Sequence, residues 1–410
     1  MNQFKIIFQD FQKCLKVAVL PIISILIYIG LKSTSILEGG MHQFNGAYHP
    51  AYLGWYDFVL GYTIIFSFVT GSLKLEIKDF FLGLIGLFII SASWTSSYQA
   101  DKMFIVAGLV CFLRFFLVFI FAKALVHELG YQTAESVLLS IYAILAVSAV
   151  LWYSLQFGGV QNRMAASAMT SASFGQVSAI MCLVFYARKY YIALFFSFIF
   201  LFLSFSRTSL LLFLLLIIIQ NRQLIPLNLI KYVVVFIILA MVGISVLQQY
   251  GGKETQVVLE SRFSTEEVSN LNGRSIIWTH AIEQVKEGRI PLTGVGFHTT
   301  PSLIHDYNLK FPNPDGEGYH IPPHYHSIVI EYVLSLGIFA FAIFFYFFKR
   351  IWQTFQRNCS PAFFIFAFFA LSQTMDFTIF PPKEIIIFAL MLGLAEGQLS
   401  FQSKILEVKN

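Results

Sequence analysis

The sequence predicts an all-α polytopic membrane protein with about twelve transmembrane helices and one large external loop that contains short helices. Runs of about 18 or more apolar residues, long enough to cross a bilayer as a helix, recur along the whole 410-residue chain. Only 12% of the residues are charged, about half the share of a soluble domain. One long polar stretch, residues 249–326, interrupts the pattern.

The apolar runs are interpreted as helices because a segment in lipid must satisfy its own backbone hydrogen bonds. The stretch 190–220 could be one long helix, but the charge at Ser204-Phe205-Ser206-Arg207 favours a turn at the membrane surface. The expected spans are residues 17–31, 57–73, 80–96, 103–122, 137–156, 170–187, 190–205, 207–220, 231–248, 327–348, 361–379 and 384–398.

The distribution of Lys and Arg orients these spans, because cytoplasmic loops are enriched in basic residues. With the N-terminus inside, the cytoplasmic segments hold 15 basic residues and the short external loops hold five. We therefore expect both termini in the cytoplasm, and a first span that is retained because no small-residue cleavage site follows it. The predicted organisation is spans one to nine in residues 1–248, the external loop in 249–326, and the last three spans and a cytoplasmic tail in 327–410.

Charge and cysteine content exclude several functions. The net charge of +5 is small and dispersed, so no nucleic-acid partner is expected. The four cysteines are far apart and none lies in the external loop, which argues against a disulfide framework or a thiolate metal site.

The external loop is the candidate functional region, because it holds six of the nine histidines and six of the twelve prolines. Ile277, Trp278, Ala281, Ile282 and Val285 recur at helical spacing and Gly288 follows as a stop. We expect a short amphipathic helix here, lying on the membrane or on the helical bundle.

Three arginines on the external side are candidate anion ligands, because a guanidinium can form bidentate hydrogen bonds to phosphate oxygens. Arg207 begins a predicted helix, and a simple interfacial arginine is the alternative. Arg274 begins the amphipathic helix, where free N–H groups also favour anions, although a solvated arginine would look the same. Arg163 precedes a run of small residues that allows a ligand to approach closely.

Two further motifs complete the loop. Gly294 and Gly296 permit a tight turn and a close backbone approach, without forming a nucleotide fingerprint. His324 and His326 flank Tyr325 just before the tenth span, and a histidine there could take a proton from a hydroxyl group. A metal site is the less favoured alternative, with a third ligand from Glu331, His298 or His320.

Polar residues inside the spans should face the bundle interior. Arg114 in the fourth span is the clearest case, and it could pair with Asp376 or extend along the span to the membrane surface.

Together these features resemble the O-antigen ligase family. The resemblance covers about residues 200–345. It rests on an arginine opening an external helix at Ser206-Arg207-Thr208, and then on a fixed order of motifs in and after the loop: Gly273-Arg274 with Trp278, Gly294-Val-Gly296, His324-Tyr325-His326, and a helix with Glu331 and Gly337. Ser327 stands where the family usually has Asn, which leaves the class of acceptor open.

The resemblance implies a GT-C-like glycosyltransferase that moves a glycan from undecaprenyl diphosphate to an acceptor hydroxyl at the periplasmic face of the inner membrane. It implies inversion at the anomeric carbon, with no metal, cofactor or nucleotide sugar. Arg207 and Arg274, assisted by Arg163, would hold the diphosphate. His326 would be the base, with His324 as the second candidate. Gly294, Gly296, Trp278, Tyr325 and Glu331 would support the loop.

Four functions remain to be separated. The compact His-x-His motif favours a ligase that joins finished O-antigen to lipid A–core. A polymerase would use a second carrier-linked repeat unit, and a protein O-glycosyltransferase would use Ser or Thr side chains. A flippase for lipid-linked glycans should instead concentrate charge at mid-membrane. The sugar and the oligomeric state are not specified by the sequence.

Overall fold

The computed structural model describes residues 2–30, 42–44, 47–49, 55–95, 102–155, 171–204, 206–221, 274–300, 303, 311–312, 319–320, 325–375 and 382–409. The predicted span 231–248 and the residues Arg163, His324 and Asp376 lie outside these ranges. The described chain divides into two compact units, one formed by Met1–Leu145 with Ile277–Asn410 and the other by Ala146–Ile276.

The first unit is a helical bundle whose elements match the predicted spans closely. Helix α5 (Tyr131–Leu155) begins in this unit, and α12 (Arg274–Lys286) ends in it. The others are α1 (Asn2–Gly30), α2 (Trp55–Val69), α3 (Ile77–Thr95), α4 (Lys102–Leu129), α14 (Ile328–Leu336), the 3-10 turn η3 (Gly337–Phe339), α15 (Ala340–Gln356), α16 (Ser360–Met375) and α17 (Pro382–Lys409).

Six described helices are long and apolar enough to cross a membrane, and four shorter helices are also apolar. Large side chains such as Phe88, Phe345 and Phe348 are exposed on them. Contiguous exposed apolar surface of this kind indicates contact with lipid. The chain is therefore a polytopic membrane protein, as predicted, while the count of twelve spans stays a prediction.

Helices α4 and α17 pack closely at the centre of the first unit. Every residue from Glu384 to Leu399 of α17 is buried. Gly393 lies against the backbone of Phe119 and the methyl group of Ala122 on α4. Small residues at this crossing let the two backbones approach, as is usual between membrane helices.

A buried ion pair joins α1, α2 and α4. Arg114 Nε lies 2.6 Å from Asp57 Oδ1, and the Tyr28 hydroxyl donates to the same carboxylate oxygen at 3.0 Å. Arg114 is only 4% exposed, so the alternative in which its side chain extends to the membrane surface is wrong. The sequence suggested Asp376 as a partner, but the described partner is Asp57, which lies 57 residues away in the chain.

The predicted span 327–348 lies within the candidate membrane span Ile328–Gln356, but its helix is broken near the middle, which the sequence interpretation did not predict. Gly337 has φ +55 and ends α14, and the chain then continues through η3 into α15. A Cβ at Gly337 would collide with the carbonyl oxygen of Leu292. The break therefore exists because part of the external loop packs its backbone against this point.

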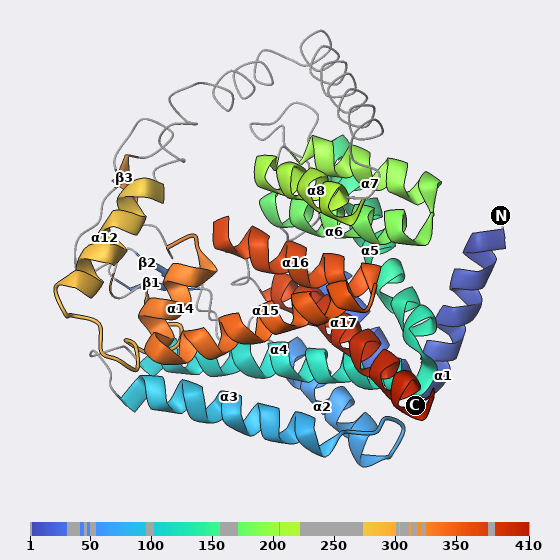
Figure 1. Ribbon diagram of the computed structural model, residues 1–410, viewed down its shortest axis with the longest axis horizontal. Coiled ribbons are helices and arrows are strands. Elements are labelled where there is room, and N and C mark those ends of the chain that lie inside the picture. The colour runs from blue at the N-terminus through green and yellow to red at the C-terminus, as the bar shows by residue number, and fades with distance from the viewer. Residues whose placement is uncertain are drawn as a thin grey trace, which may run out of the picture. The chain divides into compact units, whose positions relative to one another are not determined.

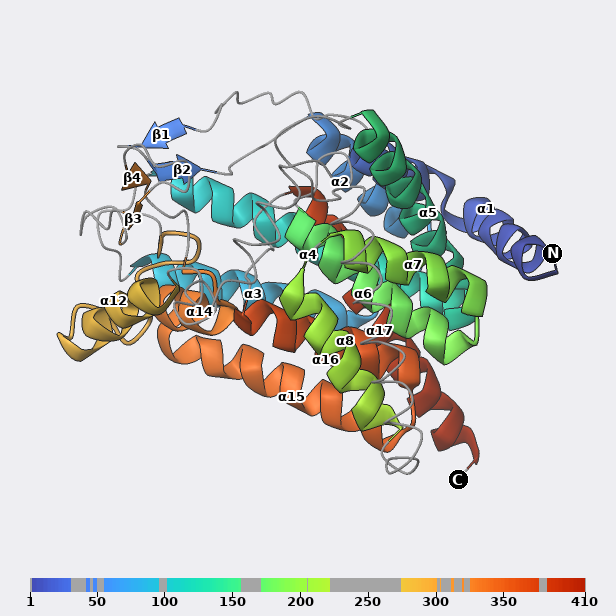
Figure 2. The same cartoon turned by 90° about the horizontal axis from the view of Figure 1, so that it is seen from above.

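The described elements of the predicted external loop lie at one end of the bundle of the first unit. Figures 1 and 2 show α12 and α14 at that end, together with two short antiparallel strand pairs, and both chain termini towards the other end. The strand pairs, which the sequence did not predict, are β1 (His42–Phe44) with β2 (Ala47–His49), and β3 (Phe311–Pro312) with β4 (Tyr319–His320).

The second unit contains α6 (Ser171–Arg188), α7 (Tyr191–Leu203) and α8 (Arg207–Gln220). The predicted break between α7 and α8 is confirmed. Gly175 of α6 lies so close to Ser204 and Ser206 that a Cβ would clash with both side chains. The hydroxyl groups of Ser206 and Ser209 are 2.7 Å apart across the first turn of α8. This junction holds Arg207 at the first position of its helix.

Candidate active site

The glycine turn of the external loop packs on the C-terminal end of α14. Val295 N donates to Leu334 O at 2.8 Å, and Gly296 N donates to Ser335 O at 3.0 Å. Gly294 has φ +85, and a Cβ there would collide with the backbone of Ser335. The predicted tight turn and close approach are therefore confirmed, and they serve to join the loop to α14.

The chain after this turn is fixed to α3 and α4. Phe297 N donates to the Ser93 hydroxyl at 3.0 Å, and the Trp94 indole donates to Phe297 O at 3.0 Å. His298 is buried, with its Nε2 3.4 Å from Cys111 Sγ. These contacts give His298 a position inside the bundle, beneath the loop.

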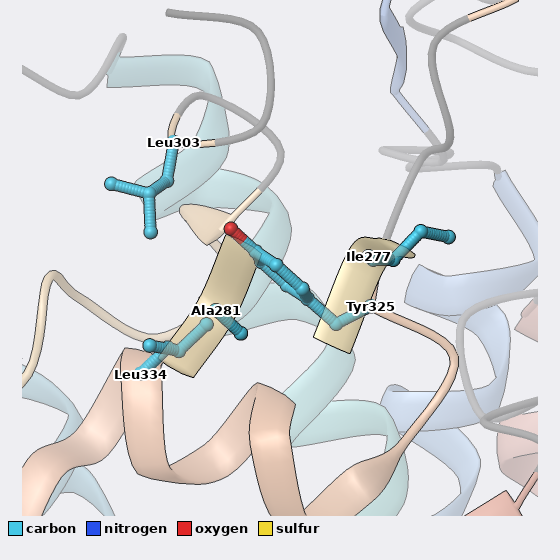
Figure 3. Close-up of a cluster of buried hydrophobic side chains, with 5 residues drawn as sticks. All are labelled: Ile277, Ala281, Leu303, Tyr325 and Leu334. Carbon is cyan, nitrogen blue, oxygen red and sulfur yellow. The ribbon is translucent and has the colours of Figure 1, made fainter. Parts of the chain in front are cut away.

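Tyr325 is the centre of the packing between α12 and α14. Its side chain is fully buried, and Figure 3 shows the ring among Ile277 and Ala281 of α12, Leu303, and Leu334 of α14. Burying an apolar side chain of this size stabilises a fold by roughly 1.5–3 kcal/mol. The predicted short helix is therefore confirmed as α12, and Ile277 and Ala281 of its expected apolar face are buried, whereas Ile282 and Val285 are exposed.

The polar groups of Tyr325 are held as well. The Trp278 indole donates to Tyr325 O at 2.9 Å, and Tyr325 N donates to Glu331 Oε2 at 3.1 Å. The Tyr325 hydroxyl lies 3.2 Å from His280 Nδ1. We call Tyr325 with Trp278, His280 and Glu331 the Tyr325 cluster.

Glu331 is a buried carboxylate on α14 that links two parts of the loop. It is 3% exposed in the first turn of α14, and its other oxygen accepts a hydrogen bond from the Thr300 hydroxyl. A buried carboxylate is costly unless its oxygens are paired, and here both are. Glu331 therefore connects the segment after the glycine turn with the backbone of Tyr325.

His326 follows Tyr325 in an uncommon backbone conformation. Its φ is +54, in the left-handed region, and its side chain is half-buried. Such a conformation costs a non-glycine residue about 1–3 kcal/mol and persists only when the surroundings enforce it. The Tyr325 cluster on one side and the start of α14 on the other supply that enforcement.

An apolar cavity of about 350 Å³ lies within the first unit, between α3, α4, α14, α15, α16 and α17. Phenylalanine, isoleucine and leucine side chains dominate its lining. His298 and Glu331 also line it, so the cavity adjoins the residues that hold the loop.

The predicted site residues divide into three groups. Gly294, Gly296, Trp278, Tyr325 and Glu331 come together, with His326 beside them. Arg207 begins α8 in the second unit, and Arg274 is the first residue of α12; both are half-buried. His324 and Arg163 lie outside the described residues, so their predicted roles stay untested.

Sequence reasoning missed His280 and Thr300. His280 lies between Ile277 and Ala281 in sequence and could have been placed near their face of α12 from helical spacing. Nothing in the sequence indicated its partner, since His280 and Tyr325 are 45 residues apart. Among the described residues, no three His, Cys, Asp or Glu side chains are grouped as metal ligands would be.

The fold and the site define a helical membrane protein that presents a half-buried histidine on a loop fixed between two helices at one end of its bundle. A family model described as O-antigen ligase matches residues 192–345, from α7 to α15. This segment is therefore similar to the O-antigen ligase family, which consists of membrane glycosyltransferases of the ligase and polymerase type. No curated protein matches the chain.

Proposed function

We propose that this chain transfers a glycan from undecaprenyl diphosphate to an acceptor hydroxyl at the periplasmic face of the inner membrane, and that the acceptor is lipid A–core. The observation that carries the proposal is the family match over residues 192–345. The matched segment includes Arg207, Arg274 and the loop residue His326. It therefore contains both of the groups that the proposed reaction needs, a diphosphate ligand and a base.

In the proposed reaction His326 removes the proton from the acceptor hydroxyl, and the oxygen attacks the anomeric carbon of the carrier-linked glycan. The bond from that carbon to the diphosphate oxygen breaks, and the electron pair leaves with undecaprenyl diphosphate. The guanidinium groups of Arg207 and Arg274, assisted by Arg163, balance the charge that grows on the leaving group. Attack opposite to the leaving group inverts the anomeric configuration, and the reaction needs no metal or cofactor.

Two structural features support the proposal. Helix α14, which begins two residues after His326, and the chain termini lie towards opposite ends of the first unit, as expected if the termini are cytoplasmic and the loop is periplasmic (Figures 1 and 2). The apolar cavity beside Glu331 offers room for hydrocarbon next to the loop. Both features suit a reaction between lipid-linked substrates at a membrane surface.

Deletion of the gene in its own host tests the proposal, with lipopolysaccharide separated on a silver-stained gel and carrier-linked glycan measured in parallel. A ligase predicts loss of the polymer ladder, with long polymer retained on undecaprenyl diphosphate. A core that bears a single repeat unit would instead identify a polymerase. An unchanged ladder would contradict both and favour a protein O-glycosyltransferase or another surface polymer.

Two arginine variants test the leaving-group assignment in the same host. Arg207→Gln and Arg274→Gln should each lower transfer by about 10²–10³-fold, the usual effect of losing a group that stabilises transition-state charge. Arg207→Lys and Arg274→Lys are the matched controls, because lysine keeps the positive charge but cannot form bidentate hydrogen bonds. Full transfer by both Gln variants would contradict the assignment. A flippase would tolerate His326→Ala, whereas the proposed transferase would not.

A further inference from the structure

We propose that His280 is a positioning residue for the transfer reaction, which acts by holding the Tyr325 phenol and thereby fixing the backbone that carries His326. The inference rests on the proposed function, since it assigns His326 to the acceptor hydroxyl. His280 lies outside the glycine, arginine and His-x-His motifs, and the reaction as described does not use it.

The contact between His280 and Tyr325 combines stacking with a hydrogen bond. The two rings are nearly parallel, with an interplanar angle of 6° and centroids 6.1 Å apart. His280 Nδ1 lies 3.2 Å from the phenol oxygen. A ring that is both stacked and hydrogen-bonded has little freedom to rotate, so the end of the Tyr325 side chain has a defined position.

The other nitrogen of His280 is held from its own helix. Gln284 lies one turn further along α12 and is 3% exposed, and its amide nitrogen is 3.2 Å from His280 Nε2. Since each nitrogen of the imidazole has a neighbour, the ring orientation is set on both sides. Burial lowers the pKa of His280, and this favours the neutral ring, which can donate from one nitrogen and accept at the other.

The hydrogen bond completes the fixation of Tyr325. Trp278 holds its carbonyl oxygen, Glu331 holds its backbone nitrogen, and His280 holds its side chain. His326 comes directly afterwards at φ +54, a conformation that needs support from its surroundings. Loss of the side-chain contact would let the residue before His326 shift, and misplacement of a reacting group by about 1 Å can lower a rate by about 100-fold.

The location of His280 on α12 adds a reason for this role. The helix begins at Arg274, a proposed ligand of the donor diphosphate, and His280 lies less than two turns later. The same helix therefore carries a proposed donor ligand and a contact to the loop of the proposed base.

The test is a double-mutant cycle on purified protein in lipid nanodiscs, with undecaprenyl-diphosphate-linked glycan and lipid A–core as substrates. His280→Phe keeps the stacked ring and removes the hydrogen bond, and Tyr325→Phe removes the phenol oxygen. Each variant should lower kcat by roughly tenfold and leave the KM for the donor unchanged, and the double variant should lower kcat no further than the worse single one. His280→Asn, whose amide can replace Nδ1 as a hydrogen-bonding group, should recover most of the loss.

Additive losses in the double variant, or an unchanged kcat in His280→Phe, would overturn the proposal. Hydrogen exchange of the amides of residues 325–330 gives a second measurement that needs no activity. Faster exchange in His280→Phe than in His280→Asn supports the positioning role, and equal exchange contradicts it. If the wild-type protein transfers no glycan, the proposed function fails, and the exchange result still decides whether His280 holds the loop.

Discussion

Two buried polar networks in the first unit differ in what they hold in place. The Arg114–Asp57 pair joins helix to helix through a cation and an anion that are both buried. The Tyr325 cluster instead joins side chains to the backbone of a loop, through an indole, a carboxylate and an imidazole. Buried charge occurs in both networks, so it does not by itself distinguish the proposed functional region, whereas the Tyr325 cluster alone fixes a loop backbone next to the left-handed His326.

Removal of the buried cation tests the structural role of the Arg114–Asp57 pair most directly. Arg114→Met leaves the Asp57 carboxylate buried without its ion-pair partner and should lower the free energy of unfolding by about 3–5 kcal/mol. The effect is measured by thermal or denaturant unfolding of the purified protein in detergent micelles. Transfer activity per folded molecule should stay at the wild-type level, because the pair only joins helices.

The double variant Arg114→Met with Asp57→Leu is the matched control. Replacing both members of a buried pair with apolar groups should restore most of the lost stability. A large loss of activity per folded molecule in the double variant would contradict a purely structural role.

A substitution in the glycine turn should have the next largest effect on stability. The turn is part of the proposed functional region, unlike the Arg114–Asp57 pair. Gly294→Ala places a Cβ at φ +85 against the Ser335 backbone. We expect a loss of stability larger than the roughly 1–2 kcal/mol that a left-handed alanine costs, together with reduced transfer activity. Gly288 is the control, since it has φ +69 and nothing within 4 Å of its Cβ position.

Unfolding of Gly288→Ala and Gly294→Ala under the same conditions separates conformational strain from the close approach to α14. Gly288→Ala should keep its activity and lose only the stability that a left-handed alanine costs. Equal losses of stability and activity in the two variants would show that the turn does not depend on its contact with α14.

The smallest expected effect concerns pH. Burial lowers the pKa of His280 in the folded protein, so the folded state resists a proton that the unfolded chain accepts near its usual value of about 6.5. Its contribution to stability is therefore present above that pH and lost as the pH falls. Glu283 and Glu287 oppose this shift, and Arg289 adds to it.

Unfolding midpoints at about pH 8 and about pH 6 measure this contribution. The midpoint should fall more in the wild-type protein than in His280→Phe over that interval. The same fall in both proteins would mean that His280 titrates as it does in the unfolded chain.

Much of the helical fold follows from the sequence because apolar run length and helix-breaking residues are local properties. The short helix α12, its stop at Gly288 and the break before Arg207 were predicted in this way. The break at Gly337 was missed because it depends on the backbone at Leu292, which reaches it only in the folded chain.

The residues of the candidate site were predicted better than their contacts. Trp278, Tyr325 and Glu331 stood out from their order in the chain, whereas the hydrogen bonds that join them span up to 47 residues. Asp57 as the partner of Arg114, and His280 as the partner of Tyr325, needed the folded arrangement of α2, α4 and α12. Pairings of this kind depend on helix packing, which the local spacing of residues does not encode.

The most direct test of the central claim is glycan transfer by His326→Asn beside the wild-type protein, each reconstituted with undecaprenyl-diphosphate-linked glycan and lipid A–core. Asparagine accepts the left-handed backbone at this position, so the loop should remain intact and the unfolding midpoint unchanged. The wild-type protein should transfer glycan, and the variant should do so at a rate lower by about 10²–10⁴-fold. Transfer by the variant at the wild-type rate would contradict the assignment of the Tyr325 cluster as the support of a catalytic base.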